Sequence, residues 1–87
     1  MTRPLRGNNF KCKSNRIARL RRALAISREV LSDMTSISIS QIRNIESEKT
    51  NMSIQSLSRI AIALECTSDY LIGLSDDPGP KWKDRQY

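Results

Sequence analysis

Eighty-seven residues make one small domain, and a domain of this size buries only roughly 60% of the surface that its unfolded chain exposes. The net charge is +6 at pH 7, and every charged residue before Glu29 is basic, which gives a one-sided field that attracts a polyanion. The chain has no histidine, and its two cysteines, Cys12 and Cys66, cannot complete a four-ligand zinc site. We therefore expect no enzyme, no metal and no cofactor. No apolar run approaches the ~20 residues that cross a bilayer, so we expect a cytoplasmic protein without membrane contact.

The first two predicted elements are an arm and a helix. Residues 1–13 combine proline, glycine and asparagine with basic side chains and have no helical period, so we expect a flexible basic arm. From Asn15 onward, Ile17, Leu20 and Leu24 recur at spacings of three and four. This spacing predicts a helix with a narrow apolar stripe and a basic outer surface.

The run from Ser27 to Asn51 reads as a short helix, a tight turn and a second helix, the arrangement that places a helix in a DNA groove. Ser38 and Gln41 form a predicted capping box: the serine oxygen accepts an amide of the first turn, and the glutamine side chain reaches back to the cap amide. The inward apolar positions are Val30 and Leu31 in the first helix, Ile37 in the turn, and Ile42 and Ile45 in the second helix. The positions left for the outer edge are Ile39, Ser40, Gln41, Arg43 and Asn44.

Two further helices and a tail complete the prediction. Ser53 is the expected cap of a helix whose core face comprises Ile54, Leu57, Ile60, Ala61 and Leu64. Thr67 is the expected cap of a short last helix that holds Tyr70, Leu71, Ile72 and Leu74 and ends near Gly73. Residues 76–87 contain two prolines and a glycine, so we expect a flexible tail. Trp82 and Tyr87 in that tail are read either as disordered or as anchors for a partner.

The unbroken register from Ile17 to Leu74 resembles the Cro/C1-type (XRE-like) helix-turn-helix regulators. The first helix of that family corresponds to IARLRRALAIS, the second to SREVLSDM, the recognition helix to SISQIRNIESEK, the fourth to SIQSLSRIAIALE and the fifth to TSDYLIGL. The most specific stretches are SQIRNIESEK and LSRIAIALECTSDYLIGL. The chain departs from the family at four positions: Arg28 replaces a usual glutamine, Thr35 a large apolar residue, and Ser36 and Glu48 two common glycines.

The resemblance implies an all-α fold, a compact five-helix lambda-repressor-like domain over residues 14–75. The arm and the tail would lie outside it. It also implies that Arg21 pairs with Glu46 and so ties the first helix to the recognition helix. The Coulomb gain of such a pair is offset by desolvation, so we expect it mainly to fix geometry.

These features together predict a sequence-specific binder of double-stranded DNA whose second motif helix, starting near Ser38, lies in the major groove. Gln41 and Asn44 carry carboxamides that can pair with the edge of adenine. Ile39 suits a thymine methyl or, equally, a contact with the neighbouring helix, and Ser40 suits a base or a phosphate. The residues expected at phosphates are Ser27, Arg28, Ser38, Arg43, Lys49, Thr50 and Asn51.

One such head covers little surface, so we expect a homodimer on half-sites about one helical turn apart, acting as a repressor. The segment from Tyr70 to Leu74 is the first candidate for the dimer contact. Two alternatives stay open. An antitoxin or adaptor would hold a protein partner through Trp82 and Tyr87, and a nonspecific RNA binder is disfavoured because the sequence offers no aromatic stacking platform.

Overall fold

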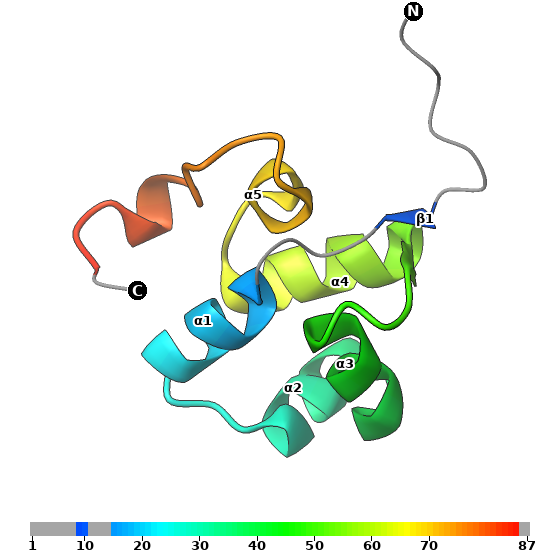
Figure 1. Ribbon diagram of the computed structural model, residues 1–87. Helices are drawn as coiled ribbons and strands as arrows, with labels where there is room; N and C mark the ends of the chain where they lie inside the picture. Colours follow the sequence, from blue (N-terminus) through cyan, green and yellow to red (C-terminus); the bar gives the residue numbers. More distant parts are fainter. Residues whose placement is uncertain (1–8, 11–14, 86–87) are drawn as a thin grey trace, which may run out of the picture.

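The computed structural model describes residues 9–10 and 15–85. Its elements in chain order are β1 (Asn9–Phe10), α1 (Arg16–Ala23), α2 (Arg28–Thr35), α3 (Ile39–Glu46), β2 (Met52–Ser53), α4 (Ile54–Leu64), α5 (Ser68–Ile72) and the short 3-10 helix η1 (Pro80–Trp82). In Figure 1, α2 and α3 lie below α4, and α5 lies above it. The predicted all-α fold with five α-helices is confirmed, with η1 and two very short strands in addition.

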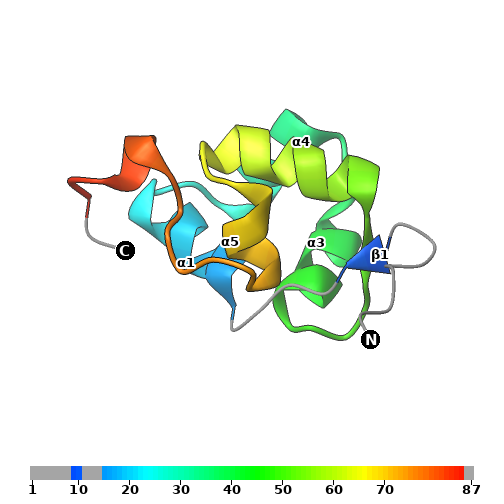
Figure 2. The ribbon, with the colours of Figure 1, turned by 90° about the horizontal axis from the view of Figure 1, so that it is seen from above.

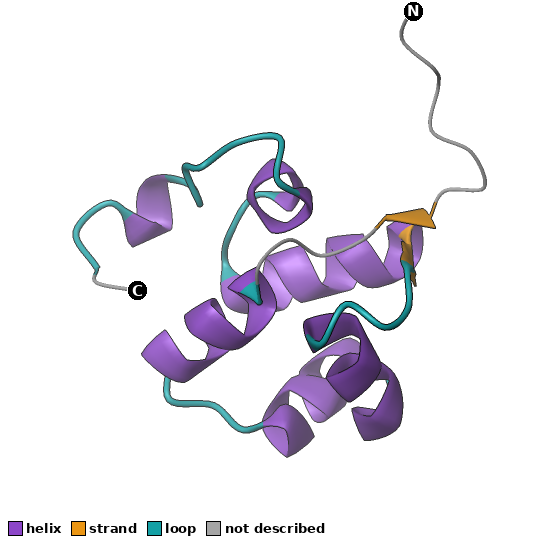
Figure 3. Ribbon diagram, viewed as in Figure 1, coloured by secondary structure: helices purple, strands orange, loops and turns teal. Residues whose placement is uncertain are grey.

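The two strands attach part of the N-terminal arm to the domain. β1 pairs antiparallel with β2, Asn9 opposite Ser53 and Phe10 opposite Met52 (orange in Figure 3). The pairing gives backbone hydrogen-bond partners to two residues that lie in no helix. It corrects the expectation of a free arm for residues 9–10. Residues 1–8 and 11–14 lie outside the described part of the chain, as does the environment of the Phe10 side chain.

Hydroxyl side chains cap the N-termini of four helices. Ser38, Ser53 and Thr67 each accept a hydrogen bond from the amide three residues further on, at 3.1, 3.1 and 3.2 Å, as the sequence predicted. Ser27 does the same at the start of α2, at 3.1 Å. Each bond satisfies one of the amides that a helix start leaves without a partner. The start of α3 is therefore fixed at Ser38.

A single apolar core lies between the helices, and two of its predicted members are exposed instead. Leu31 and Thr35 form the buried side of α2, and Val30 points about 100° away from Leu31, as adjacent residues of a helix do. Ile54 is the first residue of α4 and lies at the end of the core, where it is also exposed. The fully or nearly fully buried apolar residues are Ile17, Ala18, Leu20, Leu31, Ile37, Ile42, Ile45, Met52, Leu57, Ile60, Ala61, Leu64, Tyr70, Leu71 and Trp82.

The turn between α2 and α3 keeps its shape without the usual glycine. Ser36 adopts the left-handed conformation at φ 59°, and Glu48, at the exit of α3, does so at φ 62°. Thr35 is buried because its hydroxyl donates to the Leu31 carbonyl at 2.7 Å and accepts from the Ile37 amide at 3.3 Å. A non-glycine residue in this conformation costs roughly 1–2 kcal/mol, so these departures lower stability and leave the turn in place.

The C-terminal segment packs on the domain, which corrects the prediction of a flexible tail for residues 76–85. Figure 2 shows the segment running back from α5 past α1. The side chain of Trp82 is only 2% exposed, and its indole N–H donates to the Leu64 carbonyl at 2.9 Å. The Thr67 amide donates to the Pro78 carbonyl at 2.9 Å. Trp82 is therefore a core residue.

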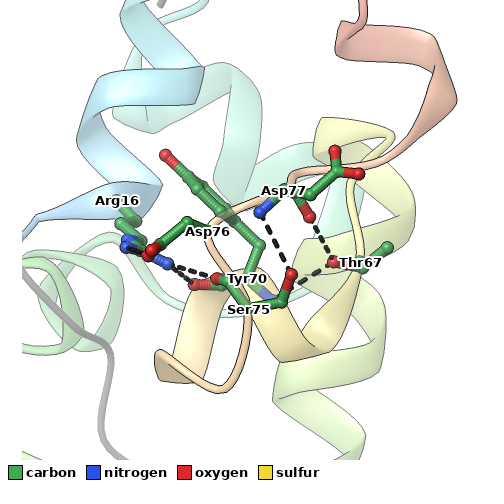
Figure 4. Close-up of polar contacts among 6 residues, drawn as sticks. All are labelled: Arg16, Thr67, Tyr70, Ser75, Asp76 and Asp77. Carbon is green, nitrogen blue, oxygen red and sulfur yellow. Dashed lines mark hydrogen bonds and ion pairs between the residues drawn. The ribbon is translucent and has the colours of Figure 1, made fainter.

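Arg16 holds the start of this segment (Figure 4). Its guanidinium donates to the carbonyls of Tyr70 and Ser75 at 2.7 Å each and pairs with the Asp76 carboxylate at 2.6 Å. It also lies over the Tyr70 ring, 4.3 Å from the ring centre. Tyr70 and Leu71 are buried in the core, so they are not available for the dimer contact that the sequence suggested for them.

Candidate nucleic-acid interface

Helix α3 divides cleanly into an inner and an outer side. Its buried residues are Ile42, Ile45 and Glu46, at helical spacing. The residues that the sequence assigned to base reading lie on the other side, where Ser40, Gln41 and Asn44 are exposed and Ile39 is half-buried. The exposed edge therefore carries two carboxamides and a hydroxyl, which are groups that both donate and accept hydrogen bonds.

The cap of α3 leaves the Gln41 side chain pointing outward. Its backbone amide donates to Ser38 Oγ at 3.1 Å. The return bond of the predicted capping box, from the Gln41 carboxamide to the Ser38 amide, is not formed within residues 15–85. The carboxamide is exposed and available to an external partner.

Ile39 lies between the starts of two helices. It borders a hollow of about 210 Å³ with Ser27, the cap of α2, and with Arg28 and Arg43. Because Ile39 is half-buried, part of its apolar surface faces α2 and part remains accessible. Both predicted uses, packing on the neighbouring helix and contact with a thymine methyl, fit this position.

A buried carboxylate fixes α3 against α1 and α2. Arg21 Nε donates to Glu46 Oε2 at 2.8 Å, so the pair that the family resemblance implied is present. Arg28 Nε donates to Glu46 Oε1 at 3.0 Å. The exposed fractions of the side chains are 8% for Arg21, 4% for Glu46 and 37% for Arg28. Glu46 thus bridges a buried arginine and a partly exposed one.

The bond from Arg28 to Glu46 is a contact that the sequence reading missed. Arg28 was predicted to contact a phosphate. In the structure its Nε donates to Glu46, and part of the guanidinium remains exposed. The sequence did contain a signal, because Arg28 replaces the glutamine that is usual in the family, and the family resemblance already implied an ion pair between Arg21 and Glu46. One residue can serve both roles, because a guanidinium has five N–H donors.

Three arginines from three helices surround a polar hollow of about 170 Å³. They are Arg22 of α1, Arg28 of α2 and Arg43 of α3. The rest of the lining is Asn15, Ala18, Ser47 and the carboxylate of Glu46. Three arginines outnumber the one carboxylate, which is already bonded to Arg28, so the net charge around the hollow is positive and favours a phosphate. Arg22 was missed by the sequence reading, although its place next to Arg21 on the basic side of α1 was visible.

The exit of α3 carries the remaining predicted phosphate contacts. Lys49 and Asn51 are exposed and Thr50 is half-buried. The Lys49 amide donates to the Asn44 carbonyl at 2.9 Å, which holds this exit close to the end of the helix. Cationic or polar groups therefore flank the outer edge of α3 at both ends.

A capped helix with a polar outer edge, preceded by a tight turn and a second helix, defines a helix-turn-helix protein. A helix-turn-helix family model matches residues 17–71, which is most of the chain. The chain belongs to the Cro/C1-type helix-turn-helix family, whose members are DNA-binding regulators. Neither the curated proteins nor the solved structures contain a match to it.

Within residues 9–10 and 15–85, no helix combines the length and the apolar character needed to cross a membrane. The same residues contain no group of three or more His, Cys, Asp or Glu side chains placed to hold a metal ion.

Proposed function

We propose that this chain is a sequence-specific repressor that binds double-stranded DNA as a dimer, with α3 in the major groove. The observation that carries the proposal is the outer edge of α3, where the exposed carboxamides of Gln41 and Asn44 lie between cationic flanks. A repressor can act by occupying its DNA site alone, and one DNA-binding domain in each copy of the chain is sufficient for that. Membership of a DNA-binding regulator family supports the same reading.

Gln41 and Asn44 are the proposed base readers. They are three residues apart, so they share one side of the helix. The carboxamide N–H can donate to N7 of adenine while its oxygen accepts from the N6 amino group, which makes a bidentate pair. Ile39 and Ser40, at the start of α3, would contact a thymine methyl and either a base or a phosphate.

The phosphate contacts are proposed to fix the register of α3 along the duplex. Arg28 and Arg43 line the arginine-rich hollow beside α3, and Lys49 to Asn51 follow the end of this helix. Ser27 and Ser38 cap helix starts, where the remaining free amides and the helix dipole favour a phosphate. These contacts supply affinity and orientation without reading sequence.

Replacement of Asn44 by alanine tests base reading. We expect specificity to relax at one or two base pairs, with a loss of about 1–3 kcal/mol for the lost bidentate pair. Fluorescence-anisotropy titrations would compare the preferred duplex with its single base-pair variants. The buried surface is not disturbed, because Asn44 is exposed.

Lys49→Ala is the matched control, because Lys49 is also exposed and is assigned to a phosphate. This variant should weaken binding to all duplexes by a similar factor and keep their ranking. An Asn44→Ala protein that ranks the duplexes as the unaltered protein does would contradict base reading by Asn44.

The alternative of an antitoxin or adaptor loses its main support. It required Trp82 as an exposed anchor, and Trp82 is buried with its N–H bonded to Leu64. Tyr87, the other aromatic of that reading, lies outside the described residues. The exposed polar edge of α3 has no role in the adaptor reading, which is why we favour DNA.

A further inference from the structure

We propose that a second copy of this chain docks on the outer face of α4, with the two α4 helices antiparallel about a twofold axis at Ile62. This inference rests on the dimer of the proposed function and identifies the surface that forms it. We call this surface the α4 face and define it by Met34, Arg59, Ile62, Ala63 and Glu65.

The α4 face exposes apolar side chains that the fold leaves uncovered. Ile62 is 77% exposed, more than any other large apolar side chain in the described residues. With Met34 of α2, also exposed, it borders an open groove of about 520 Å³. A second hollow of about 270 Å³ adjoins the groove, since both are lined by Ile62 and Glu65. Contiguous apolar surface of this kind marks an interaction site.

The charges on the α4 face are arranged to complement a second copy of the same face. Arg59 lies three residues before Ile62 on the same side of α4, and Glu65 is the residue that caps the end of this helix. All three line the same groove. In an isologous contact each surface meets its own equivalent. If two α4 helices cross antiparallel at Ile62, Arg59 of one copy faces the partner's Glu65, and the reverse pair forms as well. Two opposite-charge pairs then flank one apolar centre.

A parallel arrangement would bring like charges together. With the two helices in the same direction and Ile62 at the centre, arginine would face arginine and glutamate would face glutamate. Like-charge contacts across an interface cost several kcal/mol. The charge pattern therefore selects the antiparallel orientation.

Glu65 is free to change partners on docking. Within one copy its carboxylate lies 3.9 Å from Lys81 Nζ, and the exposed fractions of the two side chains are 44% for Glu65 and 71% for Lys81. An exposed pair at this distance contributes little to stability. Replacing it by a pair with Arg59 of the partner, beside a newly buried apolar centre, would be favourable.

The arrangement is compatible with two recognition helices on one duplex. The α4 face includes Met34 of α2, so the direction from α4 to α2 lies in the plane of the contact. If the twofold axis runs along the direction from α4 to α2, the two α4 helices are antiparallel. The α2 helices of both copies then lie on the same side of the dimer. α3 lies below α4 with α2 in Figure 1, so both α3 helices would be on that side. Two-fold binding to half-sites requires this placement.

Sedimentation equilibrium of the full chain tests the contact, with no DNA present. Ile62→Asp should convert the dimer to a monomer while far-ultraviolet circular dichroism stays unchanged, because the side chain is exposed. Leu74→Asp is the matched control, an apolar side chain that is also exposed and lies outside the α4 face. It should leave the dimer intact. A monomeric unaltered protein, or a dimer that resists Ile62→Asp, would overturn the proposal.

Charge reversal tests the orientation. Arg59→Glu alone and Glu65→Arg alone should each lower the dimerisation constant by about tenfold or more, because each homodimer then has two like-charge pairs. An equimolar mixture of the two variants should instead form a heterodimer in which both pairs are opposite in charge. Absence of that heterodimer would exclude the antiparallel register.

Failure of this contact and failure of DNA reading give different results. The Ile62→Asp monomer should keep its preference among half-site duplexes, because its α3 is unaltered. A dimer unaffected by these variants, together with normal base preference, would reject only the α4 contact. A dimer that responds as described but shows no base preference would reject only the proposed function.

Discussion

Glu46 is the residue on which the orientation of α3 depends most. Its carboxylate accepts hydrogen bonds from Arg21 of α1 and Arg28 of α2, and the residue is almost completely buried. A buried ion pair contributes little net stability, but removal of one partner leaves an uncompensated charge. The arrangement therefore fixes the position of α3 rather than adding stability.

Glu46→Ala should lower the free energy of unfolding by about 3–5 kcal/mol, because Arg21 then stays buried without its partner. Arg28→Ala should cost at most about 1 kcal/mol, since its side chain is partly exposed. Urea denaturation followed by circular dichroism measures both. Equal losses in the two variants would contradict the different roles of Arg21 and Arg28.

A double replacement controls for loss of packing. Arg21→Met with Glu46→Leu removes both charges of the buried pair and keeps most of the volume, so its stability should lie closer to that of the unaltered chain than the stability of Glu46→Ala does. Its affinity for DNA should nevertheless fall, because the geometry of α3 is then less firmly fixed.

The sequence predicted the inner and outer sides of α3 from its helical periodicity. Gln41 and Asn44 were expected outside and Ile42 and Ile45 inside, and each lies where expected, because a period of 3.6 fixes the side of a helix. The bond from Arg28 to Glu46 depends on how α2 and α3 cross. Crossing angles are not encoded in the period of either helix.

The C-terminal segment is an element of the domain rather than an appendage. η1 brings Trp82 to α4, and Arg16 fixes the preceding residues by bonds to Ser75 and Asp76. In a domain of this size, one large aromatic side chain is a substantial share of the buried apolar surface.

Trp82→Ala should therefore destabilise the domain by about 3–5 kcal/mol, through the cavity that it creates. Trp82→Phe retains an aromatic ring but leaves the Leu64 carbonyl without its donor, so we expect a smaller loss of about 1–3 kcal/mol. Thermal unfolding measures both losses, because each kcal/mol lowers the unfolding temperature by roughly 4–8 °C in a domain of 60–100 residues.

Lys83→Ala, an exposed change one residue away, is the control and should leave the unfolding temperature unaltered. An unfolding temperature that does not change in Trp82→Ala would contradict the packing of this segment.

The elements that the sequence missed have a common reason. Two prolines and a glycine exclude an α-helix after Asp76, but they do not exclude packing of one aromatic side chain on the core. The pairing of β1 with β2 joins two residues near the N-terminus to two in the middle of the chain. Neither contact leaves a local pattern, whereas the helix starts at Ser38, Ser53 and Thr67 do.

For the molecule as a whole, the charge distribution should govern how strongly it binds any duplex. The net charge is +6, and Arg22, Arg28 and Arg43 gather around one hollow beside α3. Each phosphate that is neutralised releases counterions, so affinity falls as salt rises.

Arg43→Ala should weaken binding to all duplexes and reduce the slope of log affinity against log salt by about 1. Titrations at several salt concentrations measure this slope. Lys83→Ala removes an equal charge on the C-terminal segment and should change the slope far less. Equal changes in the two variants would mean that net charge, and not the position of Arg43, determines the binding.

The most direct test of base reading by α3 is selection of bound duplexes from a random pool, followed by footprinting of the enriched sequence. We expect a palindrome with two half-sites about one helical turn apart, protected in the major groove. The enriched adenine positions should be lost when Gln41 and Asn44 are both replaced by alanine. A pool that yields no enriched sequence, or the same sequence from the doubly substituted protein, would contradict base reading by α3.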